Sequence, residues 1–291
     1  MLKKIFYLSV IFISSNLFAM ESAENKDFDK LPAGFQISWQ LDENKSHKSI
    51  IESYKKYLQA FKLNQDYRYQ IYTSFTDFML KNLTDRDISK LNKYILESLN
   101  YFYIEAPDNI NLLIRLLITL DKLNTKLINE CGWNMLHLAC MRNLPEIVTL
   151  LIQGGADINE VDDDDRTALI LVSADHNNVD VVKLLLKFKP EVNLTDEDGC
   201  TAILEASDCG NEKIVELLIN AGANPNIADI EESTPLIEAS FRGYKNIVKL
   251  LINAGADLDA KDDGGNTPLM LAKRAGHKDV EKILIKAGAT K

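Results

Sequence analysis

The chain has 291 residues, of which 46% are hydrophobic and 26% charged, so it can bury a sizeable core and is too apolar to be disordered throughout. Its formal net charge of -10 at pH 7 argues against nucleic-acid binding, because surfaces that follow phosphates rely on Lys and Arg. We therefore expect one or two soluble domains, no nucleic-acid partner, and a better fit to a basic partner.

The first residues have the layout of a secretory signal peptide. A positive start is followed by an apolar run over 5–18, which closes at Ala19 with Leu17 at the minus-three position. The alternative is a membrane anchor, but the run is interrupted by polar residues and falls short of the roughly 20 residues that a spanning helix needs. We expect a signal peptide at 1–19, export to the periplasm or the medium, and no stable membrane span after its removal.

Residues 20–128 carry fewer motifs than the rest of the chain. Residues 20–45 have the composition of a polar leader. Helical periodicity predicts a helical N-terminal region at 46–128, with helices over roughly 48–62, 65–82, 87–103 and 109–123. The apolar pattern of 114–120 recurs 33 residues later at 147–153, which predicts a degenerate capping repeat at 100–128.

A period of about 33 residues dominates the remainder of the chain. Five related motifs begin at positions 134, 167, 201, 234 and 267, and a Gly-Ala-Asp landmark recurs in step with them. One extra residue in the second unit falls near Asn177 and Asn178. Five copies in register predict a repeat array over 129–290. Its expected units are 129–161, 162–195, 196–228, 229–261 and 262–290.

Each unit contains two apolar stretches at helical spacing. The first follows a start such as Thr234-Pro235 and has a small-residue face, and the second ends at a glycine such as Gly255. Glycine takes the left-handed conformation that closes a helix. One helix pair cannot bury its apolar face, whereas five stacked pairs bury a continuous core. The pattern predicts an all-α solenoid of helix-turn-helix units joined by polar loops.

These motifs resemble the ankyrin repeat family. The resemblance rests on the 33-residue period, the Thr-Pro-Leu-x-x-Ala starts at Thr234 and Thr267, the Gly-Ala-Asp ends and His137. It implies an ankyrin-repeat solenoid with a β-turn loop, or finger, in each repeat, and a concave protein-binding surface lined by fingers and first helices. It implies no catalysis. Asn134-Met135 and 189–191 depart from the family pattern, which predicts lower stability in the first two units.

The resemblance also assigns candidate partner contacts by position, at the fingers and at the outward ends of the first helices. Aromatic, Met and Arg side chains anchor many protein interfaces. The alternative is that Trp133 and Phe241 pack against neighbouring repeats. The expected contacts of this kind are Trp133, Met141, Arg142, Arg166, Asp175, Phe241, Arg242, Tyr244 and Arg274.

Carboxylates recur on four successive fingers, at 162–165, 196–198, 229–232 and 259–263. Side by side, these loops would form a stripe that attracts a basic protein or peptide. A structural role is the alternative, because Asp accepts backbone hydrogen bonds in turns. Calcium at 162–165 is a third option, although the run lacks the spacing and closing Glu of an EF-hand loop. The expected acidic contacts are Asp163, Asp164, Glu197, Glu232 and Asp262.

The remaining reactive residues predict no active site. His137 and His277 lie where the family motif uses the ring for hydrogen bonding, Cys140 falls at a core-facing position, and the cysteines lack C-x-x-C spacing. We therefore predict a non-catalytic, exported protein-interaction module with no catalytic residues, no cofactor and no metal. The alternative is a secreted, toxin-like effector whose helical region carries an activity and whose repeats choose the target.

Overall fold

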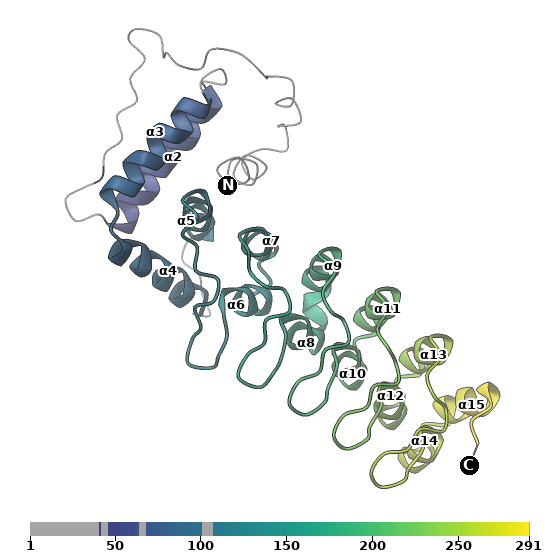
Figure 1. Ribbon diagram of the computed structural model, residues 1–291. Coiled ribbons are helices and arrows are strands. Elements are labelled where there is room, and N and C mark those ends of the chain that lie inside the picture. The colour runs from purple at the N-terminus through teal and green to yellow at the C-terminus, as the bar shows by residue number, and fades with distance from the viewer. Residues whose placement is uncertain (1–40, 42–45, 64–67, 101–106, 291) are drawn as a thin grey trace. The chain divides into compact units, whose positions relative to one another are not determined.

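The computed structural model describes residues 41, 46–63, 68–100 and 107–290 (Figure 1). The signal peptide expected at 1–19 and the leader expected at 20–45, Leu41 excepted, lie outside these residues. Within the described ranges, no helix is both long and apolar enough to cross a membrane. The chain divides into two units, Met1–Leu127 and Ile128–Lys291.

The first unit is helical over its described residues. α2 contacts both α3 and α5, and α4 also packs against α5. Aromatic rings fill the space between α2 and α3: the ring centroids of Tyr57 and Phe75 are 4.4 Å apart in a stacked arrangement, and both side chains are fully buried. The helices are α2 (His47–Leu63), α3 (Arg68–Asn82), α4 (Asp85–Asn100) and α5 (Pro107–Thr119).

The buried Asn92 connects α4 to the segment that follows α5. Its Nδ2 donates to the carbonyl oxygens of Ile88 and Lys122, both at 3.0 Å, and its Oδ1 accepts from the backbone N–H of Asn124 at 2.7 Å. α5 ends at Thr119, earlier than the expected 123, because Asp121 takes a left-handed φ of 55° that turns the chain out of the helix.

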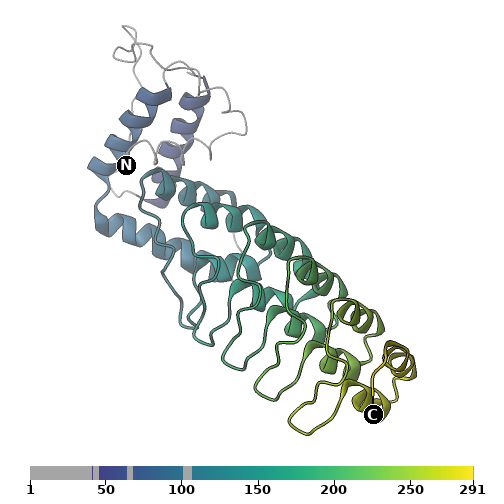
Figure 2. The ribbon, with the colours of Figure 1, turned by 45° about the vertical axis from the view of Figure 1, so that its right-hand side comes forward.

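The second unit stacks five helix pairs into two parallel rows (Figures 1 and 2). Every helix packs against its own partner or against its counterparts in the neighbouring pairs. The first helices are α6 (Met135–Met141), α8 (Ala168–Ser173), α10 (Ala202–Asp208), α12 (Pro235–Arg242) and α14 (Pro268–Ala275). The second helices are α7 (Pro145–Gln153), α9 (Val179–Lys187), α11 (Glu212–Asn220), α13 (Lys245–Asn253) and α15 (Lys278–Ala287).

Each first helix begins at a side-chain cap. The hydroxyl of Thr201, for example, accepts the backbone N–H of Leu204 at 3.3 Å, which satisfies a helix-start donor that otherwise lacks a partner. Thr167, Thr234 and Thr267 cap their helices in the same way. In the first repeat Asn134 forms a capping box with His137, so the departure from Thr-Pro preserves the cap.

Most second helices are followed by a left-handed glycine, as at Gly255 with a φ of 88°. In the second repeat, Lys189 takes the corresponding place with a φ of 56°. A side chain in this conformation costs about 1–2 kcal/mol. The same repeat contains a short 3-10 helix, η3 (His176–Asn178), where one extra residue was expected.

The core of the second unit lies between the two rows and is built from Leu, Ile, Val and Ala. Serine side chains are also buried in this core. The hydroxyls of Ser173 and Ser207 each donate a hydrogen bond to the carbonyl oxygen four residues earlier, at 2.7 Å. Among the described residues, β pairing is limited to isolated bridges such as Val161–Thr167. The predicted all-α solenoid is therefore confirmed.

Candidate functional site

A tight hairpin, the finger, precedes each first helix. In the first finger the backbone N–H of Asn129 donates to the carbonyl of Trp133 at 3.0 Å, and the same bond recurs in the other four at 3.0–3.2 Å. We define the finger face as the fingers 129–133, 162–166, 196–200, 229–233 and 262–266 together with the exposed side chains of α6, α8, α10, α12 and α14.

Neighbouring fingers are joined edge to edge by backbone hydrogen bonds. Glu197 N–H donates to the Asp164 carbonyl at 3.1 Å, Ile230 N–H to that of Asp198 at 2.9 Å, and Asp263 N–H to that of Glu231 at 2.9 Å. These bonds hold the second to fifth fingers side by side, as the loops in Figure 2 show. Finger side chains consequently share one surface.

The first residue of each finger folds its side chain back into the turn. Oδ1 of Asp196 accepts the backbone N–H groups of Asp198 and Cys200 at 3.1 and 2.8 Å, and Asn129, Asp162 and Asp229 do the same in their fingers. Asp262 accepts from the backbone and side chain of Asn266. The first carboxylate of each of the second to fifth fingers, Asp262 included, therefore stabilises the turn by accepting backbone hydrogen bonds.

The other finger carboxylates form an acidic edge. Asp163, Glu197 and Glu232 are exposed, as are Asp165, Asp198, Glu231 and Asp263. Asp164 is half-exposed and forms an ion pair with Arg166. The expected stripe therefore exists, but without the residues that close the turns.

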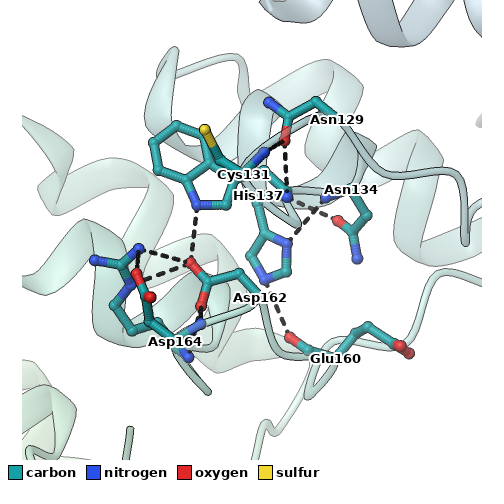
Figure 3. Close-up of polar contacts among 9 residues, drawn as sticks. Asn129, Cys131, Asn134, His137, Glu160, Asp162 and Asp164 are labelled. Atoms are coloured by element: carbon teal, nitrogen blue, oxygen red, sulfur yellow. Dashed lines mark hydrogen bonds and ion pairs between the residues drawn. The ribbon is translucent and has the colours of Figure 1, made fainter. Parts of the chain in front are cut away.

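Asp162 is a hub between the first two fingers (Figure 3). Its fully buried carboxylate accepts the indole N–H of Trp133 at 2.8 Å and the guanidinium of Arg166 at 3.0 and 3.1 Å. Burial pushes the pKa of Asp162 up, but hydrogen bonds from Arg166 and Trp133 outweigh it and the pKa is lowered. Trp133 and Arg166, both expected as partner contacts, are half-buried and make these internal contacts.

His137 links the first finger to the connection that leads into the second (Figure 3). Nδ1 accepts the backbone N–H of Asn134 at 3.3 Å, and Nε2 lies 3.1 Å from the carbonyl of Glu160. A neutral ring with its proton on Nε2 satisfies both bonds. Burial is the largest influence on the pKa of His137 and lowers it, although Asp162 and the Glu160 carbonyl oppose the shift.

The helix ends present the largest exposed side chains among the expected contacts. Met141 at the end of α6 is 37% exposed, and Phe241 near the end of α12 is 42% exposed. Arg242 pairs with Oδ1 of Asp208 at 2.7 and 2.9 Å, which links α12 to α10. Tyr244 is half-buried with its ring over Gly210.

Three further expected contacts lie along the same row of helix ends. Asp175 is exposed, and its carboxylate accepts the backbone N–H of Asn177 at 2.9 Å. Arg274 is exposed at the end of α14, and Arg142 is half-buried after α6. Most of the expected contacts at the ends of the first helices are therefore exposed to solvent. The expected contacts at the last position of a finger, Trp133 and Arg166, are half-buried.

Sequence reasoning missed a half-buried acidic pair on α10 and α12. Glu205 and Glu238 each lie four residues after a threonine cap, where the other three repeats have leucine. Burial raises the pKa of both, and the neighbouring Asp208 raises it further. Ser233 donates to Oε1 of Glu238 at 2.6 Å. The change from Leu to Glu at one repeat position is the signal that identifies this pair.

A group of metal-capable side chains is found in the described residues at Asp196, Cys200 and Glu205, all half-buried. This group lies at the base of the third finger and shares Glu205 with the acidic pair. It does not include the 162–165 run for which calcium was considered.

Stacked helix pairs with hairpin fingers define this chain as a helical-repeat solenoid. The family model for ankyrin repeats (3 copies) matches residues 101–196, 136–229 and 227–291. The chain belongs to the ankyrin repeat family, which confirms the family expected from the motifs. The match begins at 101, within the stretch expected as a capping repeat, and that expectation stays a prediction.

One curated relative shares a short segment with this chain. The BTB/POZ domain and ankyrin repeat-containing protein NPR3 of Oryza sativa subsp. japonica is 42% identical over 55 residues. The segment is 19% of this chain and 9% of the rice protein, so the match spans about a tenth of that relative's length. Ankyrin repeats generally mediate protein–protein interactions and are generally non-catalytic.

Proposed function

We propose that this protein is a non-catalytic interaction module that binds a protein or peptide through its finger face. The supporting observation is where large apolar side chains are exposed in the second unit. Among its described residues, these are Ile128, Met141, Val161, Ile230, Phe241, Met270 and Ile285. All but Ile285 lie on fingers, beside them, or on first helices.

Met270 and Ile285 have a separate explanation, because they lie in the last helix pair. The residues equivalent to Met270 in the preceding three repeats are Ile170, Leu204 and Ile237, which are at most 4% exposed. The first helix of the following repeat packs against each helix that carries those positions, whereas α14 has no such neighbour on that side among the described residues. The remaining exposed apolar side chains are thus biased toward one face, and such clustering marks interaction surfaces.

Charge on the same face favours a basic partner. Exposed carboxylates lie on the second to fifth fingers, and Glu205 and Glu238 follow them on α10 and α12. A Lys or Arg side chain approaching Glu205 or Glu238 would stabilise the ionised carboxylate, which burial disfavours. We infer an apolar peptide with flanking basic residues as the ligand, anchored at Phe241.

A peptide selection tests this function. Random peptides displayed on phage are selected on the full-length chain, and dissociation constants are measured for the best binders. We expect net positive peptides whose affinity falls about tenfold or more in Phe241→Ala, equivalent to about 1.4 kcal/mol. Ile285→Ala is the matched control and should bind normally. Equal binding of the peptides to the wild type and to Phe241→Ala would exclude the finger face as the binding site.

We further propose that the protein acts after export. This rests on the sequence pattern at 1–19 and on no structural feature. N-terminal sequencing of the protein recovered outside the cytoplasm should give Met20 as the first residue. Recovery of protein that retains Met1 would argue against it.

A further inference from the structure

The base of the third finger brings a thiol and two carboxylates together. Asp196 is the first residue of this finger, Cys200 is its last, and Glu205 lies in α10. One ligand atom from each side chain lies within 4.8 Å of the other two, and all three residues are half-buried. The group is thus sheltered but open to solutes.

Local structure holds the three side chains in place. The backbone N–H of Asp196 donates to the Cys200 carbonyl at 3.1 Å, and Oδ1 of Asp196 accepts the Cys200 N–H at 2.8 Å. Both turn bonds to this carboxylate use Oδ1, which leaves Oδ2 as the oxygen for a ligand. Thr201 then caps α10, and Glu205 follows one helical turn later, on the same side of the helix.

The combination occurs in the third repeat alone. The last finger residue is Trp133, Arg166, Cys200, Ser233 and Asn266 in repeats one to five. The residue four after the cap is Leu138, Leu171, Glu205, Glu238 and Leu271. The fourth repeat has the equivalent carboxylate, but it pairs with the Ser233 hydroxyl. Repeat stacking does not need a thiol and a carboxylate at these positions, because the other repeats lack the pair.

The surroundings of the group are short of positive charge. Among the described residues, Asp198, Asp208 and Asp229 each act electrostatically on one or more of its members, and the cation that acts on Asp196 and Glu205 is Arg166. This excess of carboxylates attracts a cation.

We propose that Asp196, Cys200 and Glu205 bind a thiophilic divalent cation of the Zn²⁺ class. Zn²⁺ combines a cysteine sulfur at about 2.3 Å with carboxylate oxygens at about 2.0–2.2 Å in a tetrahedron, so its ligand atoms lie roughly 3.5 Å apart. The three ligand atoms now lie within 4.8 Å of one another, and rotation of the side chains brings them to the shorter spacing. The Cys200 thiol releases its proton to solvent as the sulfur binds, and water takes the fourth position. Ca²⁺ and Mg²⁺ fit less well because they require more oxygen ligands.

Metal titrations of the full chain test this site. Chelator-treated protein is titrated with Zn²⁺ by calorimetry and with Co²⁺ by absorption spectroscopy. We expect one Zn²⁺ per chain at this site, and a thiolate-to-cobalt charge-transfer band. Cys200→Ser should abolish the band, and Glu205→Gln should weaken Zn²⁺ binding at least about tenfold. The absence of the cobalt band in the wild type would overturn the proposal, whatever the folding of the variants.

Two matched controls separate this site from other thiols and acids. Cys209→Ser removes an exposed thiol beyond the other end of α10, and Glu238→Gln removes the carboxylate in the same register of the fourth repeat. Both should keep the cobalt band and the Zn²⁺ affinity. Loss of the band in Cys209→Ser, or unchanged Zn²⁺ affinity in folded Cys200→Ser, would exclude the assignment. Peptide binding is measured separately, so failure here leaves the proposed function intact.

Discussion

The indole N–H of Trp133 donates to Oδ2 of Asp162 at 2.8 Å, which joins the last residue of the first finger to the first residue of the second. Asp162 also holds its own turn through the backbone N–H of Arg166 at 2.8 Å. One buried carboxylate therefore fixes two fingers at once. The contact of Trp133 with Asp162 thus attaches the first finger to the second.

Removal of the Asp162 carboxylate should destabilise the array. Asp162→Ala leaves the Trp133 indole and the Arg166 guanidinium without their buried partner, which should cost about 2 kcal/mol in free energy of unfolding. Urea denaturation of the full chain measures this. Asp163→Ala, next to it but exposed, should change stability by less than about 0.5 kcal/mol. Equal effects of the two changes would refute the hub role of Asp162.

Stability should fall on acidification because of His137. Its pKa is lowered in the folded protein, so below the ordinary value of 6.5 the unfolded chain binds more protons than the folded one. Stability is thus present above pH 6.5 and decreases as the pH falls below it. Protonation of Nδ1 also breaks the bond from the Asn134 N–H.

The His137 prediction is checked by urea denaturation at about pH 7.5 and about pH 5.5. His137→Gln should lose less stability than the wild type between these two values, because it removes this titrating group and keeps the other three histidines. The same loss in both proteins would mean that other groups cause the pH dependence.

Much of the fold follows from the sequence because its determinants are local and repeated. The threonine caps and closing glycines recur at one period, and each repeat needs only its neighbours to bury its core. The end of α5 was harder to predict, because the apolar pattern continues beyond Thr119 while the left-handed turn at Asp121 interrupts the helix.

Lys189→Gly should raise the stability of the second repeat. Lys189 occupies a left-handed conformation that glycine adopts without steric cost, so we expect a gain of about 0.5–1 kcal/mol after the greater entropy of glycine in the unfolded chain is counted. Thermal and urea unfolding measure the change. Lys187→Gly, in the last turn of α9, should instead destabilise by up to about 1 kcal/mol. A loss of stability in Lys189→Gly would contradict this account.

Ser240→Ala should also stabilise the protein. The Ser240 hydroxyl is fully buried and has no hydrogen-bond partner among the described residues, and an unpaired buried polar group costs about 1–3 kcal/mol. Its counterpart Ser207 donates to the Ile203 carbonyl at 2.7 Å, so Ser207→Ala should be neutral or mildly destabilising. Chemical denaturation of both variants distinguishes them, and a clear loss in Ser240→Ala would show that its hydroxyl is satisfied.

The candidate site was only partly predictable from sequence. Residue position within a repeat placed Phe241 and Met141 on exposed helix ends, because that position is fixed by the period. It did not reveal that Trp133 and Arg166 converge on Asp162, since that contact joins different fingers. It also did not separate the Asp side chains that close turns from those that face solvent, because both occur in the same short loop.

The central claim is that the finger face binds the partner, and hydrogen exchange on a complex tests it most directly. Amide exchange is measured on the full chain with and without the tightest selected peptide. We predict slower exchange in α10, α12 and the fingers at 196–200 and 229–233, with α11 and α13 unchanged. Slower exchange confined to α11 and α13, or to the helices of the first unit, would contradict the claim.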